Sequence, residues 1–347
     1  MKTKLTSFFA KATIALLLVI LAPPTEAWAQ QWSDSGDGTL SNPYQIKSYA
    51  ELKEFAAIVN GTGNYSESAN PSVYAILMND IVCKNDSEQE GYDTNWTPIG
   101  NESHEYTGTF DGRDPYGQVH TITGLSTPTD NTSNYVGLFG YVGSSGTVQN
   151  VILVDANITG NRYVGGIAGY NSGPIQNCAL IGTSNISSCS KTGGIVGCNN
   201  GTIKNCYVAI SGSNSISAEG SNDGEFGGIV GQNEGIVENC HYSGSGDIGF
   251  AYTTGGIVGN NSYGATVRYC YYAGTGTISG NNIGAIIGKN SGRVENSYYK
   301  EDNTLAAIDP YPENNVGTSE NVSDLTADEF KVLSNFSGKR RTKHKND

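Results

Sequence analysis

The hydrophobic positions of this chain recur in short blocks that two glycines bracket. The closing glycines of six successive blocks are 29, 28, 34, 28 and 29 residues apart. A nearly fixed spacing of this size indicates a repeat architecture with units of about 28 residues. The blocks are 137–140 (GLFG), 166–169 (GIAG), 194–197 (GIVG), 228–231 (GIVG), 256–259 (GIVG) and 285–288 (AIIG).

Each repeat continues as three short β segments separated by Gly, Asn and Ser turns. In the third copy the expected strands lie near Ile203, near Tyr207-Val208 and near Ile216. No helical period of 3.6 appears inside the repeats. One such coil cannot bury its own apolar face, so it must stack on its neighbours. The sequence therefore predicts an all-β, right-handed parallel β-helix of six or more coils.

Stacking turns every repeat position into a column, because equivalent residues of successive coils lie about 4.8 Å apart. One column holds asparagine in five repeats and Tyr269 in another. Asparagine tolerates a positive φ, and its amide can form hydrogen bonds along a stack. We expect a structural turn ladder here rather than a polar binding track. Its members are Asn150, Asn177, Asn205, Asn239 and Asn296.

The next column contains four of the seven cysteines. Because Val151 and Ser297 share this column, it predicts a small, mostly buried site where a thiol acts as a modest hydrophobe. We expect free thiols, with disulfides between neighbouring coils as the alternative for an exported protein. No CxxC pair occurs, and we expect neither a metal site nor a cofactor. The four cysteines are Cys178, Cys206, Cys240 and Cys270.

A further column, two positions beyond the asparagines, becomes aromatic toward the C-terminus. A bend at the asparagines would point it outward and would point the following column, from Leu153 to Tyr299, inward. With the opposite parity, Tyr242, Tyr272 and Tyr299 would face solvent instead. Outward tyrosines suit a glycan or protein partner, although β-propensity alone also explains tyrosines in strands. The column runs through Ile152 and Ala179, and its candidate binding residues, here called the aromatic stripe, are Tyr207, His241, Tyr271 and Tyr298.

The ends of the stack need covers, because an open stack exposes its core and strand edges. Residues 48–61 predict a capping helix that begins with the capping box Ser48/Glu51 and ends at Gly61. A second capping box, Thr326/Glu329, predicts a short C-terminal helix. We divide the chain into a signal peptide (1–29), an N-terminal cap with the first coils (30–125), the repeats (126–300), a C-terminal cap region (301–338) and a basic disordered tail (339–347).

The first residues predict export. Lys2 and Lys4 precede an apolar run over 12–22, and Ala27-Trp28-Ala29 is a small-x-small cleavage site, so we expect cleavage after Ala29. The run is shorter than the roughly 20 residues of a spanning helix. The net charge of −13 becomes about −15 without residues 1–29, which disfavours nucleic acid and anionic membranes as partners. The basic end after Gly338 is compatible with a solvated tail or with a truncated gene.

These motifs resemble the GLUG repeats of bacterial surface and secreted proteins, including non-catalytic regions of streptococcal immunoglobulin A peptidases. The resemblance covers roughly residues 36–300 and includes an upstream signature. It implies a β-helical, adhesin-like protein whose ligands are glycans or surface proteins. The upstream segments are 37–39 (DGT), 42–46 (NPYQI), 96–100 (WTPIG), 108–112 (GTFDG) and 120–125 (HTITGL).

Enzyme motifs are scarce in this sequence. His104-Glu105 lacks the second histidine of HExxH, and no GxSxG or P-loop motif occurs. A β-helical polysaccharide lyase or glycosidase remains the alternative, with Asp111 and Asp114 near Arg113 as the candidate carboxylates. In its Phe-Asp-Gly motif, Asp111 is more simply explained as a turn cap. We therefore expect a non-catalytic binding protein, with a structural spacer or truncated remnant as a third possibility.

Overall fold

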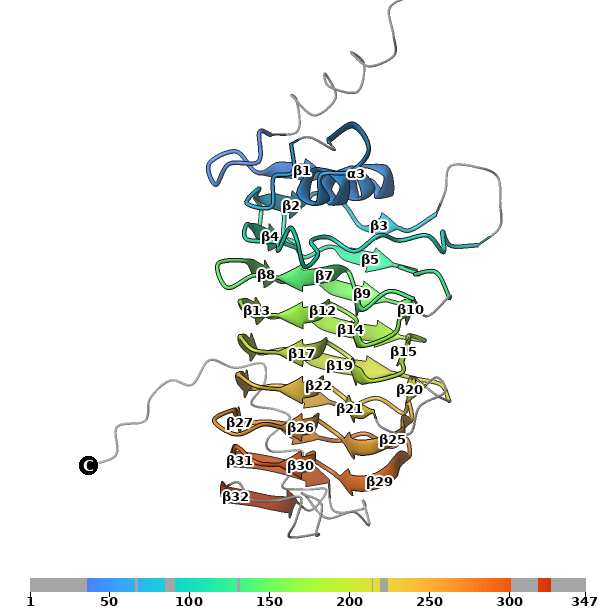
Figure 1. Ribbon diagram of the computed structural model, residues 1–347, viewed down its shortest axis with the longest axis vertical. Helices are drawn as coiled ribbons and strands as arrows, with labels where there is room; N and C mark the ends of the chain where they lie inside the picture. The colour runs from blue at the N-terminus through green and yellow to red at the C-terminus, as the bar shows by residue number, and fades with distance from the viewer. Residues whose placement is uncertain are drawn as a thin grey trace, which may run out of the picture.

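The part of the chain that the structure describes is a parallel β-solenoid of about eight turns with one α-helix at its N-terminal end (Figure 1). The computed structural model describes residues 36–65, 68–84, 91–129, 132–213, 215–218, 224–300 and 318–325. Every pair of strands is parallel, and successive coils pair in register. The prediction of a parallel β-helix with six or more coils is confirmed.

A 17-stranded sheet wraps around the asparagine corner, so that each repeat contributes one strand before the corner and one after it. Its strands are β1 (Tyr44–Ile46), β2 (Ala75–Leu77), β3 (Ile81–Val82), β4 (Thr109–Asp111), β5 (Thr121–Thr123), β8 (Thr147–Gln149), β9 (Ile152–Val154), β13 (Pro174–Gln176), β14 (Ala179–Gly182), β18 (Thr202–Lys204), β19 (Tyr207–Ile210), β23 (Ile236–Glu238), β24 (His241–Tyr242), β27 (Thr266–Arg268), β28 (Tyr271–Tyr272), β31 (Arg293–Lys300) and β32 (Thr318–Leu325).

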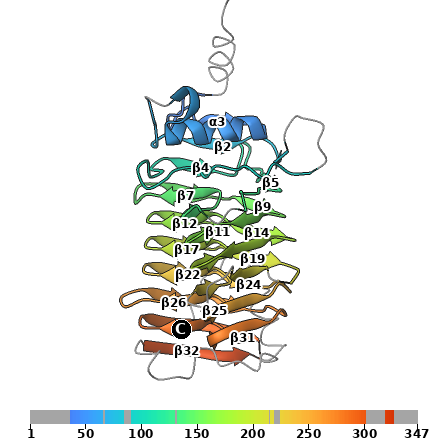
Figure 2. The ribbon, with the colours of Figure 1, turned by 45° about the vertical axis from the view of Figure 1, so that its right-hand side comes forward.

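Two smaller sheets complete each coil. The nine-stranded sheet contains β6 (Tyr135–Val136), β10 (Asn157–Thr159), β11 (Tyr163–Gly165), β15 (Asn185–Ser188), β16 (Lys191–Gly193), β20 (Ile216–Ala218), β21 (Glu225–Gly227), β25 (Ile248–Gly255) and β29 (Ile278–Gly284). The six-stranded sheet contains β7 (Phe139–Val142), β12 (Ala168–Asn171), β17 (Val196–Asn199), β22 (Val230–Asn233), β26 (Val258–Asn261) and β30 (Ile287–Asn290). Figure 2 shows the same strands stacked along the axis.

The glycine-bracketed blocks lie where the two smaller sheets approach each other. A Cβ on Gly197 would lie 2.5 Å from the backbone nitrogen of Val164, and a Cβ on Gly169 would lie 2.5 Å from that of Val136. Only glycine allows the main chains to approach this closely. Between the glycines, Ile195 and Val196 are fully buried. The periodic glycines are therefore a packing requirement of the coil.

The N-terminal end of the stack is covered by α3 (Tyr49–Asn60), as predicted (Figure 1). Ser48 is the N-cap and accepts a hydrogen bond from the Glu51 backbone N–H, while the Glu51 carboxylate accepts from the Lys47 backbone N–H. Gly61 ends the helix with φ of 61°. Leu52 and Phe55 are buried against the first coils. A single 3₁₀ turn, η1 (Gly63–Tyr65), follows.

The repeat that spans 34 residues absorbs its six extra residues at two points. Pairing separates Gly182 from Ile210 by 28 positions, Ile186 from Ile216 by 30, and Lys191 from Glu225 by 34. The extra residues therefore flank β20, and the register recovers fully by β21.

Three predicted segments lie outside the described residues. These are the signal peptide (1–29), the helix expected from Thr326 and the basic tail (339–347). Within the described ranges, no helix is long and apolar enough to span a membrane.

Candidate functional site

The aromatic stripe lies on the outward side of β19, β24, β28 and β31. Tyr207, His241 and Tyr271 form a continuous stack: the Tyr207 and His241 ring centroids are 5.2 Å apart, and those of His241 and Tyr271 are 4.5 Å apart. The planes of each pair lie within 7° of parallel. Tyr298 pairs in register with Tyr271 one coil further on. All four predicted candidates therefore share one column, and each is half-buried.

The neighbouring column faces the core. Tyr242 and Tyr272 are fully buried, whereas Tyr299 is only partly buried against the core. The bend at the asparagines thus points the stripe outward. One member of the outward column differs from the expectation: Ala179 is 1% exposed, because its small side chain pairs in register between the larger Ile152 and Tyr207.

Small side chains follow the stripe, on β19 and directly after β24 and β28. Ala209 lies two residues beyond Tyr207, and Ser243 and Ala273 take the equivalent places after His241 and Tyr271. Because side chains alternate along a strand, these residues point to the same side as the stripe. Small residues therefore lie beside the rings in three successive coils, and we call Ala209, Ser243 and Ala273 the ledge.

Stacking changes the chemistry of His241. Burial between its neighbours lowers the pKa of the His241 imidazole to about 4. The ring is therefore neutral near pH 7. A neutral imidazole can stack between two phenols without the cost of desolvating a charge.

The asparagine column forms the predicted turn ladder at the corner beside the stripe. Its five asparagines and Tyr269 all have φ between 44° and 58°. The amide of Asn177 donates to Asn150 Oδ1 at 3.2 Å, Asn205 donates to Asn177 at 3.1 Å, and Asn239 donates to Asn205 at 3.3 Å. The column is thus a hydrogen-bonded chain of side-chain amides.

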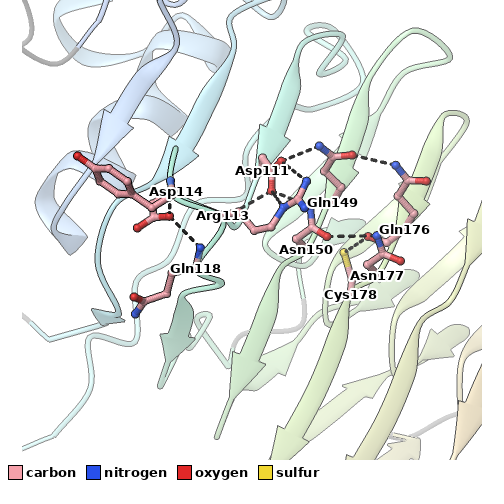
Figure 3. A network of polar contacts seen from close by, with 10 residues as sticks. Asp111, Arg113, Asp114, Gln118, Gln149, Asn150, Gln176, Asn177 and Cys178 are labelled. Carbon is pink, nitrogen blue, oxygen red and sulfur yellow. Dashed lines mark hydrogen bonds and ion pairs between the residues drawn. The ribbon is translucent and has the colours of Figure 1, made fainter. Parts of the chain in front are cut away.

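Asp111 terminates two such amide chains (Figure 3). Its Oδ1 accepts from Asn150 Nδ2 at 2.7 Å, and its Oδ2 accepts from Gln149 Nε2 at 2.7 Å. Gln149 in turn accepts from Gln176 at 2.8 Å. Arg113 donates to both carboxylate oxygens, at 3.0 Å from its backbone N–H and at 3.2 Å from Nη2. Since all the amides donate toward Asp111, their dipoles add, and the carboxylate stabilises the positive end of each chain.

Asp114 is also engaged in its own turn. Its Oδ1 accepts from the backbone N–H groups of Tyr116 and Gln118 at 2.9 and 2.8 Å. Burial acts to raise the pKa of Asp114, but these hydrogen bonds and the neighbouring His120 imidazole together outweigh it and leave the pKa below its ordinary value. The sequence therefore located two carboxylates close together in a turn, and the structure shows each of them bonded to its surroundings.

Beyond Gln176 the column next to the asparagines carries alternating charges. Lys204 Nζ lies 2.8 Å from Glu238 Oε1, and Arg268 Nη2 lies 2.5 Å from Glu238 Oε2. Hydrogen bonds, first that of Lys204, lower the pKa of Glu238. Arg293 is likewise paired with Glu295. Lys204, Arg268 and Arg293 are thus each paired with a carboxylate.

The cysteine column lies inside the coil, and all seven cysteines of the chain are free. The Cys178 thiol donates to Gln176 O at 3.3 Å, and Cys206 donates to Lys204 O at 3.4 Å. Ser297 makes the same contact, donating to Glu295 O at 2.9 Å. Cysteine and serine thus share a small donor that bonds the carbonyl two residues earlier, which explains why serine can replace cysteine. In an earlier coil Val151 fills the same buried place without a donor.

A second asparagine ladder was not predicted. It ends the strands of the six-stranded sheet, where the amide-to-amide distances are 2.8, 2.8, 2.9 and 2.8 Å. These side chains are almost completely buried. Their spacing of 28, 34, 28 and 29 residues was visible, but asparagine next to glycine is also what an exposed turn contains. The members are Asn171, Asn199, Asn233, Asn261 and Asn290.

A second aromatic group was also missed. Tyr135 stacks on Tyr163 at 5.0 Å and Tyr141 stacks on Tyr170 at 4.6 Å, and the two pairs meet edge to face. Arg162 and Lys191 lie over the Tyr163 ring, each at 5.4 Å. The faces of these rings are largely occupied by one another and by cations. We call these four residues the tyrosine quartet.

Comparison with solved structures supports the fold. The crystal structure of a "putative immunoglobulin A1 protease" from Bacteroides ovatus matches with a TM-score of 0.55, covering 87% of this chain and 89% of that chain at 21% identity. At this identity the likeness shows the fold alone. No family model matches the chain, so the resemblance to GLUG repeats stays a prediction.

Two curated proteins share part of the sequence. Halomucin of Haloquadratum walsbyi is 35% identical over 149 residues, which is 43% of this chain and 2% of halomucin. A "Putative Gly-rich membrane protein" of Evansella cellulosilytica is 32% identical over 149 residues, which is 42% of this chain and 15% of the relative. The chain thus spans only a small part of either protein.

Proposed function

We propose that this chain is an exported, surface-associated or secreted protein that binds glycans without catalysis, using the aromatic stripe as its contact surface. The observation that supports this function is the stacked column of Tyr207, His241 and Tyr271 beside the ledge of Ala209, Ser243 and Ala273. Aromatic side chains with polar tips provide contact area at low entropic cost. The adhesin-like role and membership of the GLUG-repeat proteins are part of the same proposal.

The stacking determines how a ligand would contact the stripe. Since His241 is stacked on both faces, its ring and the inner faces of its neighbours are already in contact with other rings. We therefore expect a ligand to contact the outer edges of the rings and the phenol hydroxyl groups. From Tyr207 to Tyr298 the stripe crosses three strand spacings, or about 14 Å. This geometry suits an extended chain of sugar units lying along the solenoid axis over the ledge.

The absence of catalysis is proposed because the two candidate acids have other roles. Asp111 accepts hydrogen bonds on both oxygens from Asn150, Gln149 and Arg113, and Asp114 holds a turn. A glycosidase needs one carboxyl group that retains its proton near neutral pH. The depressed pKa of Asp114 is the opposite of that requirement.

The export half of the proposal rests on the signal-like N-terminal sequence, and the name of the Evansella relative, which describes a membrane protein, is in keeping with it. Either surface attachment or release would present the stripe to extracellular polymers.

The test is a glycan array probed with the protein and with the double substitution Tyr207→Ala/Tyr271→Ala. We expect the protein to bind a subset of glycans and the variant to bind them at least about tenfold more weakly. Tyr163→Ala is the matched control, because it removes an equally stacked tyrosine from the tyrosine quartet. Unchanged binding by the double variant would reject the stripe. Binding to surface proteins but to no glycan would point to a protein ligand, and no binding at all would favour a structural spacer.

A further inference from the structure

Tyr269 is an exception in the asparagine ladder. It occupies the place held by asparagine in the coil before and the coil after, and it keeps the same left-handed backbone, with φ of 56°. A bulky side chain is uncommon in this region because its Cβ approaches the following carbonyl. The chain of amide bonds from Asp111 runs to Asn239 and stops where Tyr269 takes the next place. The tyrosine therefore lacks both structural advantages of asparagine at this corner.

The ring of Tyr269 is directed into solvent rather than into the core. It is 51% exposed, whereas Tyr242 and Tyr272 in the inward column are fully buried. Among the described residues no other aromatic ring is stacked on it, in contrast to His241 and Tyr271. Tyr269 therefore differs from the stripe in one decisive respect, because half of its side chain is exposed and no other aromatic ring in the described part of the chain covers it.

The surroundings of Tyr269 favour an uncharged ligand. Tyr271 of the stripe follows two residues later, and the exposed amide of Asn239 lies one coil earlier. Arg268, the adjacent cation, is held by Glu238 at 2.8 Å through Nε. The charge of Arg268 is thus balanced by a carboxylate, while amides supply donors and acceptors for sugar hydroxyls.

We propose that Tyr269 is the stacking residue of a subsite for a neutral pyranose ring, at the corner between the asparagine ladder and the aromatic stripe. The inference rests on the proposed glycan-binding function and adds to it the position and the chemical class of one sugar. The apolar C–H face of the sugar packs on the phenol ring, and the Asn239 amide meets its hydroxyl groups. The rest of the glycan continues over Tyr271 and the ledge. Backbone strain at an exposed aromatic residue is the kind of local cost that binding sites retain.

The experiment is the substitution Tyr269→Asn, which restores the residue of the other coils. Two readouts are measured: the melting temperature, and the affinity for neutral hexasaccharides of glucose, mannose, xylose and N-acetylglucosamine. We expect the melting temperature to rise by about 2 to 4 °C, because strain is relieved and the ladder is completed. We expect affinity for the bound hexasaccharide to fall about tenfold. A variant that is more stable but binds less cannot be explained by unfolding.

Two control variants sharpen the result. Tyr269→Phe keeps the ring and is expected to bind within about twofold of the unmodified protein. Tyr263→Asn removes another tyrosine of the same coil, 92% exposed on the turn between β26 and β27, and is expected to leave affinity unchanged. Hexagalacturonate is the acidic probe and is expected to bind more weakly than the neutral hexasaccharides.

The failures of the two proposals are distinguishable. If Tyr269→Asn binds as tightly as the unmodified protein while Tyr207→Ala/Tyr271→Ala does not, the Tyr269 subsite is wrong and the stripe stands. Preference for hexagalacturonate would overturn the neutral class of the sugar. If the unmodified protein binds no glycan, the proposed function fails and this inference fails with it.

Discussion

The imidazole of His241 lies 4.5 Å from the phenol ring of Tyr271, and the two planes are within 5° of parallel. Residues 30 positions apart in the sequence thus lie one above the other, because successive coils pair in register at β24 and β28. This contact links the fold to the candidate site. The register that buries Tyr242 on Tyr272 also stacks the outward rings.

This relationship predicts a pH dependence of stability. The folded-state pKa of His241, about 4, lies below its ordinary value of 6.5, so between these values the unfolded chain binds a proton that the folded chain does not. The free energy of unfolding is therefore highest above pH 6.5 and decreases as the pH falls from 6.5 toward 4. After allowance for solvent screening, we expect this decrease in the free energy of unfolding to be about 1 to 2 kcal/mol.

Urea unfolding at pH 7.0 and pH 4.5 measures this effect. His241→Phe keeps a flat ring without the titrating group, and it should lose less stability over the same pH interval than the unmodified protein. An equal loss in both proteins would contradict the neutral, buried state of the His241 ring. His104 and His120 are retained in both, so they do not affect the comparison.

The two asparagine ladders predict different costs for the same substitution. Asn199 is buried, donates to Asn233 at 2.8 Å and accepts from Asn171 at 2.8 Å, so Asn199→Ala removes one hydrogen bond from each of two buried amides. We expect Asn199→Ala to lower the free energy of unfolding by about 3 kcal/mol. Asn205 in the same coil is exposed, and Asn205→Ala should cost only about 1 kcal/mol, mainly through its positive φ.

Denaturant titrations of both variants check this order. Asn205→Gly is the control for backbone strain, since glycine adopts a positive φ freely. It should recover part of the loss seen in Asn205→Ala. If Asn205→Ala were the more damaging substitution, the outer ladder would be the main source of stability, contrary to its exposure.

The cysteine column predicts thiols that are free yet unreactive in the folded protein. Burial raises the pKa of the Cys178 and Cys240 thiols well above the ordinary value, which keeps them protonated at neutral pH. A thiol reagent such as DTNB requires an accessible thiolate. In the folded state we expect rapid reaction at Cys189 alone, because the other six cysteines are buried.

Titration in denaturant without reductant counts all the thiols. All seven should then react. A shortfall of two or four would show disulfides between neighbouring coils and would revive the alternative considered from the sequence.

The sequence was sufficient to predict which residues share a column. A fixed period and parallel pairing together place equivalent positions of successive repeats above one another. It thereby predicted the positive φ of Asn205, the inward Cys206 and the capping helix after Ser48. It could not separate buried from exposed asparagine, since Asn199 and Asn205 both sit next to turns.

Contacts between columns were also beyond the sequence. Tyr163 and Tyr170 meet edge to face only because the two smaller sheets approach each other at the glycines. Likewise, nothing in the local Phe-Asp-Gly motif shows that Asp111 receives two amide chains from the next coil. Distances between columns depend on the shape of the coil, which the period alone does not determine.

The central claim is that the protein binds a glycan at the aromatic stripe and leaves it intact. The most direct measurement combines binding with product analysis: the protein is incubated with a glycan that it retains on the array, and the recovered sugar is examined by mass spectrometry and assayed for reducing ends. We predict saturable binding that Tyr207→Ala/Tyr271→Ala weakens, with the glycan recovered at unchanged mass. New reducing ends or unsaturated products would contradict the account and would identify a carbohydrate-active enzyme.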